Sequence, residues 1–234
     1  MTKQRQIAAW LVHLYTVFGG ILGLFALFEA ARGNFENTFL LLIASHWVDG
    51  TDGLLARAVK VWEVLPNFSG EMVDNLIDIF TYLWLPVFII WKADALPSDY
   101  WLILPVIGAM YAYGQVNMKT EDNFFLGFPT LWDGISIYVV YLRPAEWVAV
   151  LMILIPTIFS FIPVRFLYPS RNTFLSKSSW ALAVMWIGLW IYILTTEPEN
   201  RTLVFLSLYF PAFYLFGSFY ANYRLYKEAR IAAA

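Results

Sequence analysis

Four aspartates, Asp49, Asp52, Asp74 and Asp78, lie inside or beside apolar segments in the middle of the first half of the chain. An ionisable side chain at the centre of a membrane helix costs about 2.5–3.5 kcal/mol on insertion scales. Four such side chains close together therefore need a partner of opposite charge. Any fold of this chain has to supply that partner.

The composition predicts that these aspartates belong to a membrane protein. Of the 234 residues 60% are hydrophobic and 14% are charged, whereas an average soluble domain carries roughly 25% charged residues. The sequence contains no cysteine, which excludes disulfides and thiolate metal sites. Its two histidines, His13 and His46, favour packing or polar contacts between helices over a zinc site. A net charge of −2 gives no basic surface for nucleic acid.

Apolar segments long enough to span a membrane recur along the whole chain. A helical span takes roughly 20 apolar residues. The fifth segment is interrupted by Gly127, Pro129, Asp133 and Gly134, which predicts a short or broken helix. We expect an all-α polytopic protein with about eight transmembrane helices in a single domain, 1–234. The segments cover about residues 7–30, 37–57, 70–92, 98–117, 124–142, 145–168, 175–195 and 201–225.

The distribution of basic residues predicts the orientation of these helices. With a cytoplasmic N-terminus and eight spans, the outer side holds only Arg32, Lys92, Arg143 and Arg201 of the 15 lysines and arginines. The remaining basic residues fall on the inner side, so the positive-inside rule places both termini in the cytoplasm. The loop 58–69, between the two halves of the aspartate-rich stretch, then also faces the cytoplasm.

The spacing of the aspartates predicts that they converge. Asp49, Asp52, Gly53 and Ala56 follow helical spacing along one face of the second segment. Gly70, Asp74, Asp78 and Tyr82 follow a strict i+4 run on the third segment. If these two helices run antiparallel around the loop 58–69, Asp49 and Asp78 reach a similar depth, about 12 Å from the inner helix ends at about 1.5 Å per residue.

Converging carboxylates indicate a metal site. Four aspartates carry −4, which two divalent cations would balance, and hard oxygen ligands favour Mg²⁺, Mn²⁺ or Ca²⁺. Paired divalent cations are typical of phosphoryl chemistry. Gly53, Ala56 and Gly70 leave room for a phosphorylated ligand near the backbone, although small residues also serve ordinary helix packing. Arg57 offers a planar fork of donors for phosphate.

Two other interpretations of the intramembrane acids are open. Acids near a helix end often reach the membrane interface and have no further role, but four at i+3 and i+4 spacing on consecutive helices do not fit that pattern. A cation or proton transporter would also use intramembrane acids. Such a pathway predicts acids spread through the membrane depth on several helices, whereas these acids cluster toward one side.

The residues of this stretch resemble the CDP-alcohol phosphotransferase family. The family pattern D-x2-D-G-x2-A-R-x(n)-G-x3-D-x3-D is matched at every fixed position. The gap 58–69 is longer than is common in the family, and in this respect the chain looks like its bacterial phosphatidylcholine synthase branch, as do the stretches 9–16, 119–133 and 161–171. The matching positions are Asp49, Asp52, Gly53, Ala56, Arg57, Gly70, Asp74 and Asp78.

The resemblance implies a function and a role for each motif residue. It implies transfer of the phosphatidyl group from CDP-diacylglycerol to choline, with release of CMP, in the bacterial cytoplasmic (inner) membrane. The aspartates would hold two divalent cations, Mn²⁺ or Mg²⁺, and Asp78 would also take the acceptor's proton. Asp52, Gly53, Ala56, Arg57 and Gly70 would surround the cytidine diphosphate group. Family members are commonly homodimers, which implies a second copy of the chain as a partner.

Aromatic residues near the motif are candidates for an acceptor pocket, because a quaternary ammonium ion favours aromatic faces. Tyr82, one turn beyond Asp78, is the first candidate. Arg165 and Arg171 are candidates for the lipid phosphate, and Glu121 and Asp133 could attract a cation. The main alternative is the same donor with serine, glycerol 3-phosphate or inositol phosphate as acceptor. The further candidates for the pocket are Tyr111, Tyr113, Trp132 and Tyr168.

Overall fold

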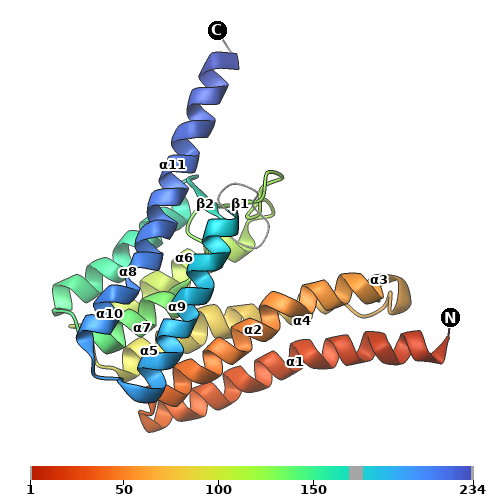
Figure 1. Cartoon of the computed structure of the whole chain (residues 1–234), viewed down its shortest axis with the longest axis horizontal. Coiled ribbons are helices and arrows are strands. Elements are labelled where there is room, and N and C mark those ends of the chain that lie inside the picture. The colour runs from red at the N-terminus through yellow and green to blue at the C-terminus, as the bar shows by residue number, and fades with distance from the viewer. Residues whose placement is uncertain (1, 169–175, 233–234) are drawn as a thin grey trace. The chain divides into compact units, whose positions relative to one another are not determined.

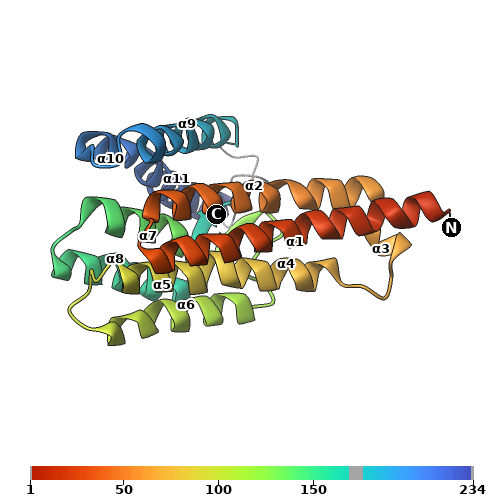
Figure 2. The same ribbon diagram turned by 90° about the horizontal axis from the view of Figure 1, so that it is seen from below.

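The computed structural model describes residues 2–168 and 176–232, which form two compact units, 1–93 and 94–234. We describe each unit by itself. The first unit is entirely helical within its described residues, and Figures 1 and 2 show α1 lying beside both α2 and α4. Its elements are α1 (Lys3–Arg32), α2 (Phe35–Val59), α3 (Val61–Val64), α4 (Gly70–Ile79), the π-helix η1 (Phe80–Trp84) and α5 (Leu85–Lys92).

Glycines on α1 allow its neighbours to approach closely. A Cβ atom at Gly19 would lie 3.1 Å from Val48 of α2, and one at Gly23 would lie 2.8 Å from Thr81 of η1. The α1–α2 pair is also held by a hydrogen bond from Ser45 Oγ to the Gly19 carbonyl, at 2.8 Å. Small residues at such interfaces are the usual way for membrane helices to pack. The polar face of α2 is therefore fixed against α1.

The second unit combines helices with a small strand pair. Tyr138 of α7 links three helices, because its hydroxyl bonds to Ser207 of α10 and accepts a hydrogen bond from Trp186 of α9. The elements are the 3₁₀-helix η2 (Asp99–Leu102), α6 (Ile103–Gly114), β1 (Phe124–Leu126), α7 (Trp132–Leu142), α8 (Glu146–Phe161), β2 (Arg165–Leu167), α9 (Ser176–Thr196), α10 (Arg201–Ser207) and α11 (Tyr209–Ala232).

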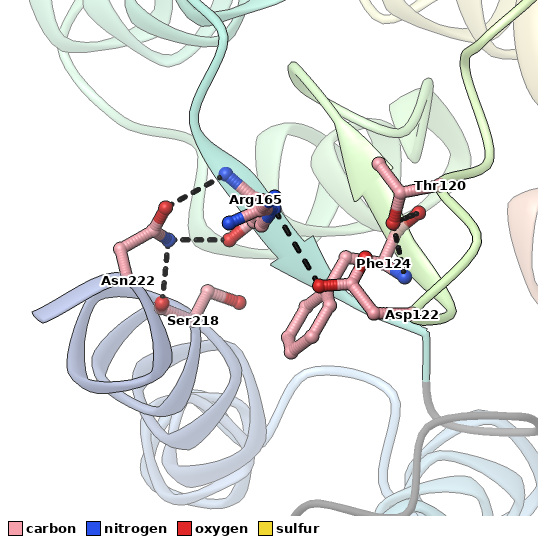
Figure 3. A network of polar contacts seen from close by, with 6 residues as sticks. All are labelled: Thr120, Asp122, Phe124, Arg165, Ser218 and Asn222. Carbon is pink, nitrogen blue, oxygen red and sulfur yellow. Dashed lines mark hydrogen bonds and ion pairs between the residues drawn. The ribbon is translucent and has the colours of Figure 1, made fainter. Parts of the chain in front are cut away.

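Helix α11 covers the second edge of strand β2. On one edge β2 pairs antiparallel with β1, with Phe125 opposite Phe166. On the other edge Asn222 of α11 accepts a hydrogen bond from the Arg165 N–H and donates one to the Arg165 carbonyl, as Figure 3 shows. The Leu167 N–H donates to Ser218 Oγ, and Tyr214 donates to the Leu167 carbonyl. Side chains at i, i+4 and i+8 of α11 thus take the place of a third strand.

The structure confirms a largely helical membrane protein but departs from the expected pattern in places. Among the described residues four helical stretches are long and apolar enough to cross a membrane: Lys3–Arg32, Gly70–Lys92, Lys177–Thr196 and Arg201–Glu228. Helix α2 is also long, but polar residues such as His46, Asp49 and Asp52 lower its hydropathy.

The all-α fold class holds, and within it two three-residue strands replace parts of the expected spans. The fifth expected span, 124–142, begins with strand β1 and becomes helical only at Trp132, because Gly127 and Pro129 interrupt it. The sixth ends in strand β2. Eight spans, the orientation of the termini and the single domain stay predictions.

Candidate metal centre

Three of the four motif aspartates converge in the first unit. Carboxylate oxygens of Asp49 on α2 and of Asp74 and Asp78 on α4 all lie within 4.8 Å of one another. Each of the three residues is half-buried. The helical spacing explains this geometry, because Asp74 and Asp78 are one turn apart on the same face of α4. The predicted convergence of the two segments is therefore present in the structure.

Asp52, the fourth aspartate, is held in a different way. It is only 7% exposed, and its Oδ2 accepts a hydrogen bond of 2.7 Å from the Thr16 hydroxyl of α1. It shares a small cavity with Asp49 and Asp74. A buried carboxylate needs such a donor, since burying a charge without a partner is costly. Asp52 thus belongs to the same site, with one of its oxygens bonded to α1.

Gly53, Ala56 and Arg57 continue the polar face of α2 toward the loop. The Arg57 guanidinium folds back over Gly53, where an added Cβ atom would lie 3.3 Å from Nη1. Arg57 is exposed and also interacts electrostatically with Asp52. Ala56 packs against the apolar cluster formed by Ala9, Val12, Val61 and Val64. Gly53 therefore leaves room for the Arg57 guanidinium beside the aspartates.

Gly70 has a neighbour that the sequence did not suggest. A Cβ atom at this position would lie 2.6 Å from Cε1 of His13 on α1. His13 is 5% exposed and is surrounded by Trp10 and Phe68, whose rings lie 6.0 Å and 4.5 Å from the imidazole. The absence of a side chain at Gly70 thus lets His13 pack against the start of α4, in line with the packing role expected for this histidine.

Tyr82 lies beside the aspartates and contacts Asp49 and His46. Its hydroxyl donates a hydrogen bond of 2.9 Å to Oδ2 of Asp49. Its ring is stacked on His46, with centroids 4.3 Å apart and an interplanar angle of 10°. The face of the ring that meets His46 is therefore covered, and the role of Tyr82 in an acceptor pocket stays a prediction for its other face.

The other aromatic candidates belong to the second unit. Tyr111 and Tyr113 lie on α6, and the Tyr111 ring contacts Phe161 at 4.6 Å. Trp132 is fully buried, so its ring contributes to the core of this unit. Tyr168 contacts Phe125 at 4.4 Å and has the Lys119 ammonium group 5.9 Å from its ring centre. That ring already faces a cation in this structure.

Of the two predicted lipid-phosphate residues, Arg165 is the first residue of strand β2. Arg165 pairs with Asp122 at a nitrogen–oxygen distance of 3.7 Å, and Figure 3 shows the two side chains facing each other. The charge of Arg165 is therefore partly compensated by Asp122, which lies in the loop before β1. Arg171 lies outside the described residues. Glu121 is exposed in the same loop, whereas Asp133 is half-buried in the first turn of α7.

The donor set of the first unit fits divalent cations. It consists of carboxylate oxygens from several residues, and hydroxyl donors bond to one oxygen each of Asp49 and Asp52. Hard cations such as Mg²⁺ and Mn²⁺ prefer oxygen ligands of this kind. Carboxylates that bind metals are usually held by such outer hydrogen bonds. The number of cations and their identity stay predictions.

Thr16 is a site neighbour that the sequence did not reveal, and Tyr15 beside it contacts α2 away from the aspartates. Thr16 bonds to Asp52, and the Tyr15 hydroxyl lies 2.8 Å from Thr51 Oγ1 on the same stretch of α2. Both residues lie in the stretch 9–16, which resembles the phosphatidylcholine synthase branch of the family. Their polar side chains in a long apolar helix were a signal that this helix faces the aspartates.

Relatives with assigned names identify the family. No family model matches the chain. It is 32% identical to the phosphatidylcholine synthase of Legionella pneumophila, over 99% of this chain and 95% of that protein. It is 31% identical to that of Rhizobium meliloti, over 90% and 89%, and 30% identical to that of Pseudomonas aeruginosa, over 98% and 96%. With its complete CDP-alcohol phosphotransferase motif, the chain therefore belongs to the phosphatidylcholine synthase family.

Proposed function

We propose that this protein is a phosphatidylcholine synthase, which transfers the phosphatidyl group of CDP-diacylglycerol to choline. The observation that carries the proposal is the similarity to phosphatidylcholine synthases over nearly the whole length of both chains. The convergence of Asp49, Asp74 and Asp78 supports the chemistry, because such a donor set suits phosphoryl transfer.

Different residues of the site carry out proton transfer and phosphate binding in the proposed reaction. The hydroxyl oxygen of choline forms a bond to the phosphorus that carries diacylglycerol, the bond from that phosphorus to the bridging oxygen breaks, and CMP leaves. Asp78 accepts the choline hydroxyl proton and passes it to water. Arg57, beside Gly53, binds the phosphate oxygens and stabilises their charge in the transition state. Attack on the phosphorus and transfer of the proton both depend mainly on how the site positions the reacting groups.

Asp49, Asp52, Asp74 and Asp78 would hold the divalent cations. When bound, Mn²⁺ or Mg²⁺ supplies positive charge that polarises the phosphate and stabilises the leaving oxygen. The protein holds the ligands in place before the substrate arrives, since Thr16 and Tyr82 each bond one of the carboxylates. This arrangement predicts that chelation abolishes turnover and that added Mn²⁺ or Mg²⁺ restores it.

The proposal includes a location for the reaction. We propose the bacterial cytoplasmic membrane, with about eight spans, both termini in the cytoplasm and the aspartates toward the cytoplasmic side. CDP-diacylglycerol would then enter from the bilayer while choline arrives from the cytoplasm. The residues of the choline pocket stay predictions, and a homodimer remains the proposed assembly.

The assay that tests the proposal uses membranes containing the full chain, CDP-diacylglycerol, Mn²⁺ and labelled choline. We expect labelled phosphatidylcholine and an equal amount of CMP. A product formed with serine, glycerol 3-phosphate or inositol phosphate, but not with choline, would reassign the acceptor. Movement of a cation without release of CMP would instead indicate a transporter.

The substitution Asp78→Asn tests the role of the last aspartate. The amide keeps the shape of the side chain but can neither accept the proton nor supply an anionic ligand, so we expect turnover to fall to background. The melting temperature of the purified protein should stay close to that of the wild type. Activity at the wild-type level would remove both roles from Asp78.

A further inference from the structure

The contact between Tyr82 and Asp49 joins two elements that are far apart in the sequence. Tyr82 lies on η1 and Asp49 on α2, and the hydroxyl donates to Oδ2 at 2.9 Å. A hydrogen bond to an ionised carboxylate is stronger than one between neutral groups. It fixes one oxygen of Asp49 and leaves the other oxygen able to bind elsewhere. The direction of the Asp49 carboxylate is thus set by a residue outside the motif.

His46 holds the ring that carries this hydroxyl. It stacks on Tyr82 at 4.3 Å with nearly parallel planes. His46 precedes Asp49 by three residues on α2, so the two side chains lie on the same helix face. The tyrosine is therefore held at its ring and at its hydroxyl by the same helix.

The π-helix η1 sets the direction in which Tyr82 leaves its own helix. The Leu85 N–H donates to the Phe80 carbonyl, five residues earlier, and the Thr81 hydroxyl donates to the Ile77 carbonyl at 2.9 Å. A wide turn of this kind rotates the residues within it relative to those before it, and such turns are frequent at functional sites. Here the wide turn begins two residues after Asp78. Tyr82 lies inside this wide turn.

We propose that Tyr82, held by His46 and directed by η1, is a positioning residue that orients the Asp49 carboxylate for a divalent cation. The inference rests on the proposed metal-dependent function and adds to it a residue outside the family motif. It predicts that the hydroxyl of Tyr82, and not its aromatic face, is what the site needs. The choline pocket would then be built mainly by other residues.

The variant Tyr82→Phe separates the hydroxyl from the ring. It keeps the stacking on His46 but removes the hydrogen bond to Asp49. We expect Mn²⁺ binding to the purified full-length protein, measured by electron paramagnetic resonance without substrates, to weaken roughly 10–100-fold, the usual loss when such an outer contact is removed. At saturating Mn²⁺ the KM for choline should equal that of the wild type.

Tyr15→Phe is a matched control. The Tyr15 hydroxyl of α1 bonds at 2.8 Å to Thr51 of α2, the helix that carries Asp49. It bonds to no carboxylate in any contact that the structure describes for it. This variant should bind Mn²⁺ like the wild type. A second variant, His46→Phe, keeps an aromatic ring against Tyr82 and should retain most of the affinity, whereas His46→Ala should lose part of it.

Three outcomes would overturn the inference. The first is wild-type Mn²⁺ affinity in Tyr82→Phe. The second is a raised KM for choline in that variant with unchanged Mn²⁺ binding, which would give the hydroxyl a role toward the acceptor. The third is a wild-type protein that binds no Mn²⁺. A wild type that binds Mn²⁺ but forms no phosphatidylcholine would defeat the proposed function and leave the role of Tyr82 intact.

Discussion

Asp49 and Asp52 are three residues apart on α2, yet each accepts a hydrogen bond from a hydroxyl group on a different helix. Asp49 is bonded by Tyr82 of η1, and Asp52 by Thr16 of α1. Both contacts reduce the cost of placing an anion away from water, and both leave ligand capacity free on the carboxylate. At the scale of residues, the site is therefore a set of carboxylates oriented by hydroxyl donors that do not belong to the motif.

The substitution Thr16→Val tests the donor to Asp52. It leaves a buried carboxylate oxygen without this hydrogen bond, so we expect the free energy of unfolding to fall by about 1–3 kcal/mol. Thermal unfolding of the purified protein in detergent measures the loss. Thr16→Ser should restore most of the stability, since it keeps the hydroxyl.

Thr157→Val on α8 is the comparison for that change. The Thr157 hydroxyl is equally buried, but it bonds to the Ile153 carbonyl one turn earlier in its own helix. Its loss should change the melting temperature much less. Equal decreases in melting temperature in the two valine variants would show that the bond to Asp52 stabilises the protein no more than a hydrogen bond within one helix.

At the scale of elements, the glycine face of α1 fixes the distance between the helices that carry the site. Gly23→Ala would place a methyl group 2.8 Å from Thr81 Cγ2. Overpacking of this kind usually costs about 1–3 kcal/mol, so we expect a lower melting temperature. Gly188→Ala on α9 is the control, because a Cβ there meets no atom within 4 Å in the part of the chain that the structure describes. It should be neutral or slightly stabilising.

The elements that could be predicted from the sequence are those with a strong period. Asp49, Asp52, Asp74 and Asp78 stand at helical spacing, and that spacing together with an antiparallel turn at the loop 58–69 predicts their convergence. The strands β1 and β2 could not be predicted, because each has only three residues and only three residues separate β2 from the end of an apolar helix. The π-helix was also hidden, since Phe80–Trp84 reads as part of a continuous apolar helix. Partners such as Thr16 for Asp52 depend on helix packing, which spacing within one segment does not determine.

At the scale of the whole molecule, the orientation of the first unit can be tested directly. The sequence has no cysteine, so single cysteines introduced at exposed positions report on one site each. With the positive-inside orientation, Asn67→Cys should react with an impermeant maleimide only after the cells are permeabilised. Arg32→Cys, at the opposite end of α1, should react in intact cells. The reverse pattern would invert the proposed membrane orientation.

The cover that α11 gives to β2 has a consequence for how the chain is made. The bonds from Tyr214, Ser218 and Asn222 span 47, 51 and 57 residues of sequence. During synthesis both strands of the β1–β2 pair are therefore made well before the helix that covers the second edge of β2. Until then the strand presents unpaired backbone groups that could recruit another strand. A nascent chain that stops before Tyr214 thus lacks all three of these side-chain bonds to β2.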